Sequence, residues 1–504
     1  MEKKSKIKVR NLLVKDPFLA IQPYIAPERT SVVDGQMTYV EDDPTWNILT
    51  QADFLRELYV SGHKILDDKY YPDEYVQVDI NGKKEWVRKL VSRVTVPFQL
   101  IIKVQRNIHL CGNDTVFSLS NQEPSEEDKA LFANIKQLWL DKNMEICKFQ
   151  NIDSFNCTGD TATLFYFAEE EGKKVIKWKV YSYLDKYKIY CHMDQFTNKP
   201  KVFAVEYKQC DEENNAITSF VDVYDESNFY RFKKDLTGAK KIINKIAEEL
   251  FGLDSYELIE QKPHGFKRCP VEYRRSRIGA CWTPSQNNIE QYEKGLSQFC
   301  DNSKVLGTAM VFIKGSNAEI EGMSTGQPFA ITSSDPNADA KILNKSDISN
   351  AFTEELKVLK DTILMGSFSV VPPEIRSGDL PGVAIKLIYS PSLEKAMEEA
   401  REWDAFIDGL MELFLYGAGI ELECSSRLKN LKITGRIEPY IHENTAEKIQ
   451  NLVISKQAGI TSTETASQKM PYNSNYEYEI IRKERDEQIR IEQQGMAQMI
   501  NPQQ

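Results

Sequence analysis

Apolar residues that recur every three or four positions predict helices along much of the chain. The longest is expected to open at Ser390-Pro391 and to keep this spacing for about 30 residues. Residues with capping side chains set several boundaries, because they satisfy the first backbone N–H groups of a helix. The expected helices are 50–62, Ser125 to Trp139, 240–250, Thr283 to Asn302, Ser346 or Asp347 to Gly366, Ser390 to Gly417, Thr445 to Ala458, and a last one that a capping box of Thr461 and Glu464 opens ahead of Pro471.

Residues 152–235 have a different pattern, in which aromatic and β-branched runs alternate with charged turns. This pattern predicts an antiparallel meander. The strand-like runs are 161–167, 175–181, 188–190, 202–207 and 220–224. Together with the helices, they predict an α+β fold.

The helix expected to end at Gly366 has an unusually narrow apolar stripe, made of Ile348, Phe352, Leu356, Leu359 and Ile363. So narrow a stripe does not suit a helix that is buried on all sides. The loop that follows, 369–382, holds three prolines and two glycines, so parts of it are stiff and parts are hinged.

Composition narrows the function classes. Hydrophobic residues make up 41% of the 504 residues and charged residues 28%, which excludes a wholly disordered, collagen-like or coiled-coil protein. We expect no bilayer span and no secretory signal, because no apolar run is long enough for either. The net charge of −11 argues against a general nucleic-acid coat, but it does not exclude a protein that lets DNA pass without gripping it.

One pattern typical of serine hydrolases is present, Gly322-Met-Ser324-Thr-Gly326. In such enzymes the serine lies on a sharp turn between a strand and a helix, and Asp and His follow later in the chain. Asp335 or Asp339 and then His442 satisfy that order, but no helix is expected after Gly326. A flexible loop is therefore the favoured interpretation, and a hydrolase built on Ser324 stays the alternative.

Metal and cofactor chemistry has little support. The nine cysteines form no Cys-x-x-Cys pair, so reduced and mostly buried thiols are expected. Cys191, His192 and Asp194 could begin a metal site, but the five histidines are scattered and a metal needs three or four converging ligands. No phosphate-binding loop of the Gly-x4-Gly-Lys-Ser/Thr type is present. We expect no metal and no cofactor.

Two charged segments allow simpler interpretations. The basic segment 262–278, with Lys267-Arg268 and Arg274-Arg275, either touches phosphate or lies at a subunit interface or a solvated turn. The acidic pair Glu398-Glu399 is expected on the solvated face of its helix.

From residue 86 to about 485, the order of motifs resembles tailed-bacteriophage portal proteins of the siphophage type, the head-to-tail connectors. Each motif is weak by itself, and the case rests on their order and spacing. The motifs are Phe266-Lys-Arg-Cys-Pro-Val271, Ala309-Met-Val-Phe-Ile-Lys-Gly315, Asp361-Thr-Ile-Leu-Met-Gly-Ser-Phe368, Gly382-Val-Ala-Ile-Lys386, Leu393-Glu-Lys-Ala-Met397, and Ala446-Glu-Lys-Ile-Gln450 with the Gly459 and Pro471 segments after it.

The resemblance implies a homo-oligomeric ring, typically a dodecamer, at one vertex of the virion capsid. Such a protein would be made in the host bacterial cytoplasm and would have no catalysis of its own. Its parts would be a mixed wing with the antiparallel meander, a helical stem, a small α/β clip and a helical C-terminal crown. The implied boundaries are 1–280 for the wing, 281–304 and 346–368 for the stem helices, 305–345 for the clip, 369–384 for a tunnel loop, 385–430 for the long wing helix, and 431–504 for the crown and tail.

The resemblance also implies partners and sites. Double-stranded DNA would pass through the channel during packaging and ejection, and the expected protein partners are the terminase large subunit, then a head–tail adaptor, and the major capsid protein. The residues expected to face DNA are Pro372, Pro373, Glu374, Arg376, Ser377, Gly378, Asp379 and Gly382. The residues expected to dock partners at the clip are Lys314, Glu319, Glu321 and Asp335.

Overall fold

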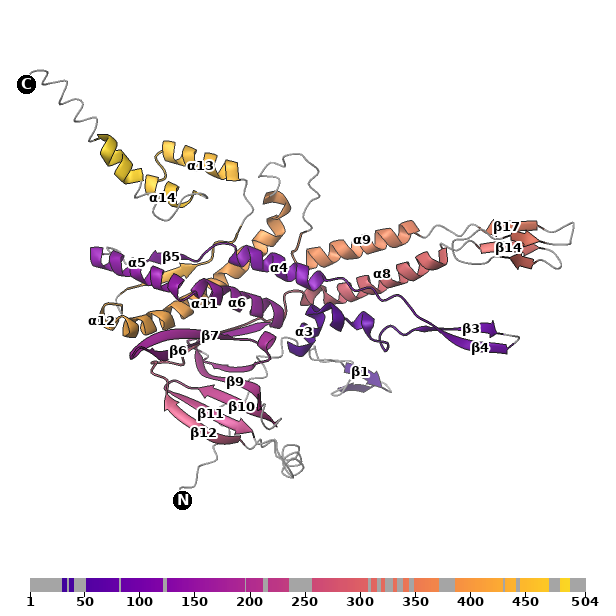
Figure 1. Cartoon of the computed structure of the whole chain (residues 1–504), viewed down its shortest axis with the longest axis horizontal. Coiled ribbons are helices and arrows are strands. Elements are labelled where there is room, and N and C mark those ends of the chain that lie inside the picture. The colour runs from indigo at the N-terminus through magenta and orange to yellow at the C-terminus, as the bar shows by residue number, and fades with distance from the viewer. Residues whose placement is uncertain are drawn as a thin grey trace, which may run out of the picture. The chain divides into compact units, whose positions relative to one another are not determined.

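The computed structural model divides the chain into two compact units, Met1–Val371 with Glu394–Tyr440, and Pro372–Leu393 with Ile441–Gln504. Helices and antiparallel sheets occur together, which confirms the predicted α+β class (Figure 1). The residues that the structure describes are 30–33, 36–39, 51–80, 83–120, 125–194, 196–211, 216–234, 256–306, 310–314, 319–321, 330–332, 339–343, 349–370, 386–428, 431–440, 445–470 and 481–489.

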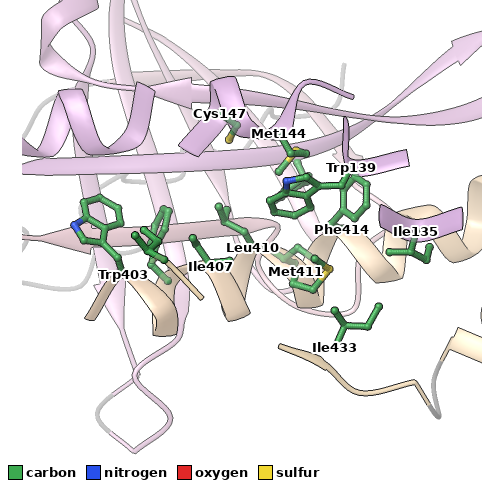
Figure 2. Packing of buried hydrophobic residues seen from close by; sticks show 14 of the residues in the cluster. Ile135, Trp139, Met144, Cys147, Trp403, Ile407, Leu410, Met411, Phe414 and Ile433 are labelled. Atoms are coloured by element: carbon green, nitrogen blue, oxygen red, sulfur yellow. The ribbon is translucent and has the colours of Figure 1, made fainter. Parts of the chain in front are cut away.

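Helix α11 (Ser390–Glu421) carries the largest core, and its predicted start at Ser390 is confirmed. The apolar side of α11 packs against residues from three other helices. Figure 2 shows Trp139 beside Phe414 of α11. Two contacts are edge-to-face aromatic pairs, Trp139 with Phe414 and Phe155 with Trp403, each with ring centroids 5.2 Å apart. The three helices are α4 (Phe98–Cys111), α5 (Glu126–Asp141) and α6 (Met144–Thr158).

The boundaries of these helices test the sequence patterns. Ser125 caps α5 as predicted, and Asp128 completes the capping box. Helix α6 was not predicted, because its sequence has no clear amphipathic stripe. It is buried on several sides, and even Asn151 and Asn156 lie inside the protein with hydrogen-bonded side chains.

The strand-rich region forms two antiparallel sheets rather than one. The predicted meander is confirmed for the runs 188–190, 202–207 and 220–224, which form β8, β9 and β10 of a five-stranded sheet in the order β12-β11-β10-β9-β8. The runs 161–167 and 175–181 form β6 and β7, which pair in a separate sheet with β13. A core that includes Leu164, Val271, Phe203 and Val205 contains residues from both sheets. The strands are β6 (Asp160–Glu170), β7 (Lys173–Tyr181), β8 (Lys188–Met193), β9 (Pro200–Asp211), β10 (Ala216–Tyr224), β11 (Asn228–Lys234), β12 (Tyr256–Pro263) and β13 (Val271–Arg275), with the short helix η3 (Tyr183–Asp185).

A helical hairpin follows β13. It consists of the turn η4 (Thr283–Ser285), α8 (Gln286–Leu306) and α9 (Ser349–Gly366), and α8 and α9 lie side by side (Figure 1). The predicted cap at Thr283 is wrong. Its hydroxyl is buried with no hydrogen-bond partner among the described residues, because Thr283 lies inside η4 after Trp282. Between the helices, two antiparallel pairs are described, β14 (Met310–Lys314) with β17 (Asp339–Leu343), and β15 (Glu319–Glu321) with β16 (Ala330–Thr332).

Shorter elements complete the first unit. Strand β5 (Val116–Leu119) pairs with β18 (Ile433–Arg436), so the segment after α11 is tied to the N-terminal half. The remaining elements are β1 (Thr30–Val33) paired with β2 (Gln36–Tyr39), α3 (Gln51–Leu58), η1 (Val60–Gly62), η2 (Lys64–Leu66), β3 (Glu74–Ile80) paired with β4 (Lys83–Lys89), and α12 (Ser425–Leu428).

The second unit holds α13 (Thr445–Gln457), α14 (Thr463–Gln468) and a helical segment at 481–489. Gly459 follows α13 with a positive φ of 72°, as expected for the residue that ends a helix. The predicted cap at Thr461 is wrong by one residue, because the Ser462 hydroxyl accepts the Thr465 N–H. The helix expected over 240–250 lies outside the described residues.

Candidate functional site: the base of the α8–α9 hairpin

Helices α8 and α9 are antiparallel and touch along one narrow line. Gly295 of α8 lets Leu356 approach closely, and the rings of Phe299 and Phe352 lie 6.1 Å apart. At the base of the hairpin, the Ser285 hydroxyl donates to the Ile363 carbonyl at 2.9 Å. The described stripe residues of α9 are half-buried until Ile363, which is fully buried, so the predicted narrow stripe is confirmed there.

An extended segment, residues 91–97, lies along α8, and we call it the strap. Alternate strap residues donate backbone N–H groups to α8 side chains one turn apart: Ser92 to Asp301, Val94 to Ser297, and Val96 to Glu293, at 2.8–3.0 Å. Two extended residues advance about 6.6 Å and four helical residues about 6 Å, so the two spacings match over a few steps. The strap therefore fixes the register of α8 against the segment that leads into α4.

A buried charged pair fastens the same helix. The Nδ1 atom of His63 lies 2.6 Å from a carboxylate oxygen of Glu293, and both side chains are only 2% exposed. The other ring nitrogen, Nε2, lies 2.9 Å from the Glu57 carbonyl oxygen. Because both partners are hydrogen-bond acceptors, the imidazole meets both by carrying two protons. Burial lowers the pKa of His63, but the hydrogen bond and the charge of Glu293 outweigh it and raise the pKa overall.

Glu57 and Lys64 extend this cluster. The indole N–H of Trp282 donates to the Glu57 carboxyl at 2.9 Å, and Lys64 pairs with Glu290 of α8 at 2.8 Å. Burial raises the pKa of Glu57 to about 7, although the Trp282 hydrogen bond acts in the opposite direction. We call His63, Glu293, Glu57, Trp282, Lys64 and Glu290 the hairpin seat.

The chain leaves α9 through a second polar contact. The amide oxygen of Gln105 in α4 accepts the Val370 N–H at 3.0 Å, and its amide nitrogen donates to the Val370 carbonyl. Ser369 is held as well, since its N–H donates to the Leu364 carbonyl at 2.8 Å. One side chain of α4 thus fixes the backbone where the 369–382 loop begins.

Residue 106 connects α4 to α11. The Arg106 guanidinium forms a two-pronged ion pair with Glu399, and both side chains are mostly buried. The prediction that Glu398-Glu399 is a solvated face is therefore right for Glu398 and wrong for Glu399. Periodicity alone could not separate the two, because the partner of Glu399 comes from another helix.

Comparison with known families decides what this architecture is. A model for the family described as "Phage portal protein, SPP1 Gp6-like" matches residues 42–490. The match covers most of the 504 residues. The chain belongs to this phage portal protein family.

Membership confirms the resemblance to portal proteins. These are structural proteins of the capsid vertex that act in DNA packaging, and they are not an enzyme family. No curated protein matches the chain. Within the described part of the chain, no helix is long and apolar enough to cross a membrane.

Most of the predicted portal site residues fall where the structure gives no side-chain detail. Lys314 lies in β14, and Glu319 and Glu321 lie in β15, where the backbone alone is described. Nine further predicted residues lie outside the described residues, as does Ser324 of the hydrolase alternative: Asp335, Pro372, Pro373, Glu374, Arg376, Ser377, Gly378, Asp379 and Gly382.

The basic segment 262–278 is engaged within its own chain. Arg274 lies over the rings of both Trp403 and Phe155, with its guanidinium carbon 4.1 and 4.6 Å from the two ring centroids, and it pairs with Glu402 at 2.6 Å. Burial lowers the pKa of Arg274 to about 10. Arg268 pairs with Glu272 at 3.2 Å. Neither a free phosphate contact nor a solvated turn describes these two arginines.

The candidate metal residues do not converge. Cys191 is buried beside Met193, whereas Asp194 accepts the N–H groups of Phe196 and Thr197 in its own turn. Among the described residues, no group of three His, Cys, Asp or Glu side chains could hold a metal ion. Most of the cysteines that the structure describes are buried, as predicted.

Proposed function

We propose that the chain forms a closed ring, with a dodecamer as the expected number, and that the ring is the channel for double-stranded DNA at the capsid vertex. The proposal rests mainly on the family match over residues 42–490. The α8–α9 hairpin supports the proposal, because α8 covers the apolar stripe of α9. Most other described α9 side chains are exposed in a single chain. Such a helix is suited to a channel wall, in which one of its sides contacts a neighbouring subunit.

The charge of the wall suits a passing polyanion. The chain carries a net charge of −11, and the exposed face of α9 includes Glu354, Glu355 and Asp361. An acidic wall binds phosphate weakly, so DNA slides rather than sticks. The loop 369–384 is proposed to face this DNA, with Arg376 as the single base of its 369–382 part. Gln105 would hold the start of that loop in place.

We further propose that residues 305–345 form the clip, which docks the terminase large subunit during packaging and a head–tail adaptor afterwards. The remaining assignments are 1–280 with the long helix 385–430 as the wing facing the major capsid protein, 281–304 and 346–368 as the stem, and 431–504 as the crown and tail. The ring would have no catalysis of its own. Substitution Ser324→Ala should accordingly leave infectivity unchanged.

The ring is tested by native mass spectrometry and negative-stain imaging of the purified full chain. We expect one large species that appears as a ring with a central hole. A monomer or dimer at micromolar concentration would contradict the proposal.

The loop is tested by the pair Pro372→Gly with Pro373→Gly. We expect rings to assemble but DNA packaging or retention to fall, because the loop loses its stiff side. Arg376→Ala should act in the same direction with a smaller effect. The measurement is packaged DNA per assembled capsid, and full-length packaging by the double variant would reduce this loop to a plain connector.

The clip is tested by deletion of Gly315–Gly326. The ring should persist while terminase or adaptor binding is lost in a pull-down. If the ring itself falls apart, the segment is structural and the docking assignment is wrong.

A further inference from the structure

The hairpin β3–β4 has no partner strand in the described part of the chain. It is a two-stranded sheet, in which Tyr75 lies opposite Arg88 and Gln77 lies opposite Trp86. Isolated two-stranded hairpins are marginally stable in water, and each leaves two open edges. Such an element usually packs on something else.

Large apolar side chains of the hairpin and its root are exposed. Leu90 is 70% exposed, Trp86 67%, Tyr75 63% and Val87 40%. It is uncommon for a tryptophan and a leucine four residues apart to be so exposed on a surface that contacts only water. Trp and Tyr are also the residues that most often anchor protein interfaces.

Polar contacts at the root of the β3–β4 hairpin fix its orientation. At its root, Asp73 accepts hydrogen bonds from Arg88 at 2.7 Å and from the Val91 N–H at 3.2 Å, and it pairs with Arg93 at 3.1 Å. Directly after the root, the strap is bonded to α8 at every second residue from Ser92. A hairpin whose orientation is already fixed loses little conformational entropy on binding, which favours its role in a protein interface.

A second apolar surface is exposed on α4. Leu100, Val104 and Ile108 follow one another at intervals of four residues, and Ile101 lies beside them, each 41–48% exposed. The opposite side of α4 is buried in the core through residues such as Ile102 and Leu110. This stripe therefore faces outward from its own chain and is as apolar as a helix interface.

The hairpin cannot cover the α4 stripe of its own chain. The strap connects Leu90 directly to Phe98 at the start of α4, and its seven residues extend over about 20 Å. Because the strap is pinned along α8, the hairpin points away from the helix that follows it. Each chain thus presents two different unsatisfied apolar surfaces, which is what a head-to-tail ring interface requires.

We propose that the β3–β4 hairpin of one subunit packs on the exposed α4 stripe of a second copy of this chain, with Trp86 and Leu90 as the anchors. The inference rests on the proposed ring and names one surface that joins neighbours. The occupant is a second copy because the family forms oligomers and because a single chain carries both halves of the contact.

The test compares full-length variants by native mass spectrometry. Trp86→Glu with Leu90→Glu should reduce the ring fraction at least tenfold, and Val104→Glu with Ile108→Glu should do the same. The matched control is Phe196→Glu, a turn residue that is 96% exposed and lies outside both surfaces, and it should assemble normally. The circular dichroism spectrum of the remaining monomer should match that of the wild-type chain.

A charge exchange separates a lost contact from a lost fold. Trp86→Glu combined with Val104→Lys should restore part of the ring that Trp86→Glu alone loses. Rings of normal abundance in the Trp86→Glu/Leu90→Glu variant would show that the β3–β4 hairpin does not join subunits, while the ring proposal would stand. Loss of rings with that variant, but normal rings with Val104→Glu/Ile108→Glu, would overturn α4 as the acceptor. A wild-type chain that is monomeric would overturn both the ring and the hairpin contact.

Discussion

The core around α11 and the seat of α8 hold the protein together in opposite ways. Around α11, large apolar side chains such as Trp403, Leu410 and Phe414 exclude water, and their edge-to-face contacts need no single partner atom. Around α8, the contacts are buried hydrogen bonds and charges, as between His63 and Glu293. The first arrangement supplies stability, and the second fixes where one helix stands.

The difference matters because a hydrogen-bonded charge pair requires one particular geometry, whereas the packing of a leucine depends little on direction. A buried pair contributes modestly over an apolar replacement, yet removal of one partner is costly because the other stays buried and unpaired. A helix that must hold a constant position gains from such a seat. The region around α11, which needs bulk stability, gains from an apolar core.

The largest effect is expected in the α11 core. Trp403→Ala removes a fully buried ring that packs on Phe155 and Arg274, so it should lower the free energy of unfolding by about 3–5 kcal/mol. Met397→Ala on the same helix is the control, because Met397 is half exposed and should cost less than about 0.5 kcal/mol. Urea denaturation of the monomeric chain measures both. Equal midpoints for the two variants would show that the core is not centred on Trp403.

A smaller loss is expected at the seat. Glu293→Gln leaves the buried His63 without its counter-charge, at a cost of about 2–3 kcal/mol. Glu355→Gln on the exposed face of α9 serves as the control and should be nearly neutral. In a double-mutant cycle with His63→Gln, the two losses should not add, since both remove the same pair. Additive losses would mean that the pair is not coupled.

The seat should also make stability fall as the pH rises. The folded pKa of His63 is raised, so its contribution is present below pH 6.5 and is lost as the pH passes the folded value. Glu57 has a folded pKa of about 7 against 4.5, so its contribution is lost between about pH 4.5 and 7. Denaturation midpoints from pH 5 to 8 test this, and Glu57→Gln should flatten the part below pH 7. A midpoint that rises over this range in the wild type relative to Glu57→Gln would contradict the assignment.

The smallest effect is expected at Gln105. Gln105→Ala removes both hydrogen bonds to Val370 and should cost about 1 kcal/mol. Its sharper signature is local, because the Val370 amide should exchange with solvent faster while the buried Ile363 amide does not. Hydrogen exchange with mass detection resolves the two peptides. Unchanged protection at Val370 would mean that another group holds the start of the loop.

The apolar pattern predicted the parts of the fold that depend on apolar periodicity. The start of α11 at Ser390, the end of α9 at Gly366 and the helix cap at Ser125 are all local signals, and all are confirmed. The pattern failed where a helix is buried on several sides, as in α6, and where pairing joins distant strands, as with β13 beside β6.

The seat and the strap could not be predicted for a different reason. Their contacts join residues about 200 positions apart, and the residues involved look like ordinary surface residues in the sequence. A lone histidine such as His63 carries no signal until Glu293 is beside it. The β-branched residues of Val91-Ser-Arg-Val-Thr-Val96 are one hint, since they favour an extended backbone.

The strap also limits how the chain can change in length. Its three rungs match two residues of extended chain to four residues of helix, and the mismatch of about 0.6 Å per rung accumulates along the pair. A single insertion between Glu293 and Asp301 rotates the later rungs by about 100° around α8, away from their donors. Only an insertion of four residues in α8 together with two in the strap keeps every donor opposite its acceptor. The same pairing of two with four recurs where Gly435 and Ile437 donate to Asp408 and Asp404 of α11. Natural insertions in such a helix and in the extended segment bonded to it should therefore occur together, four residues in the helix for two in the extended segment.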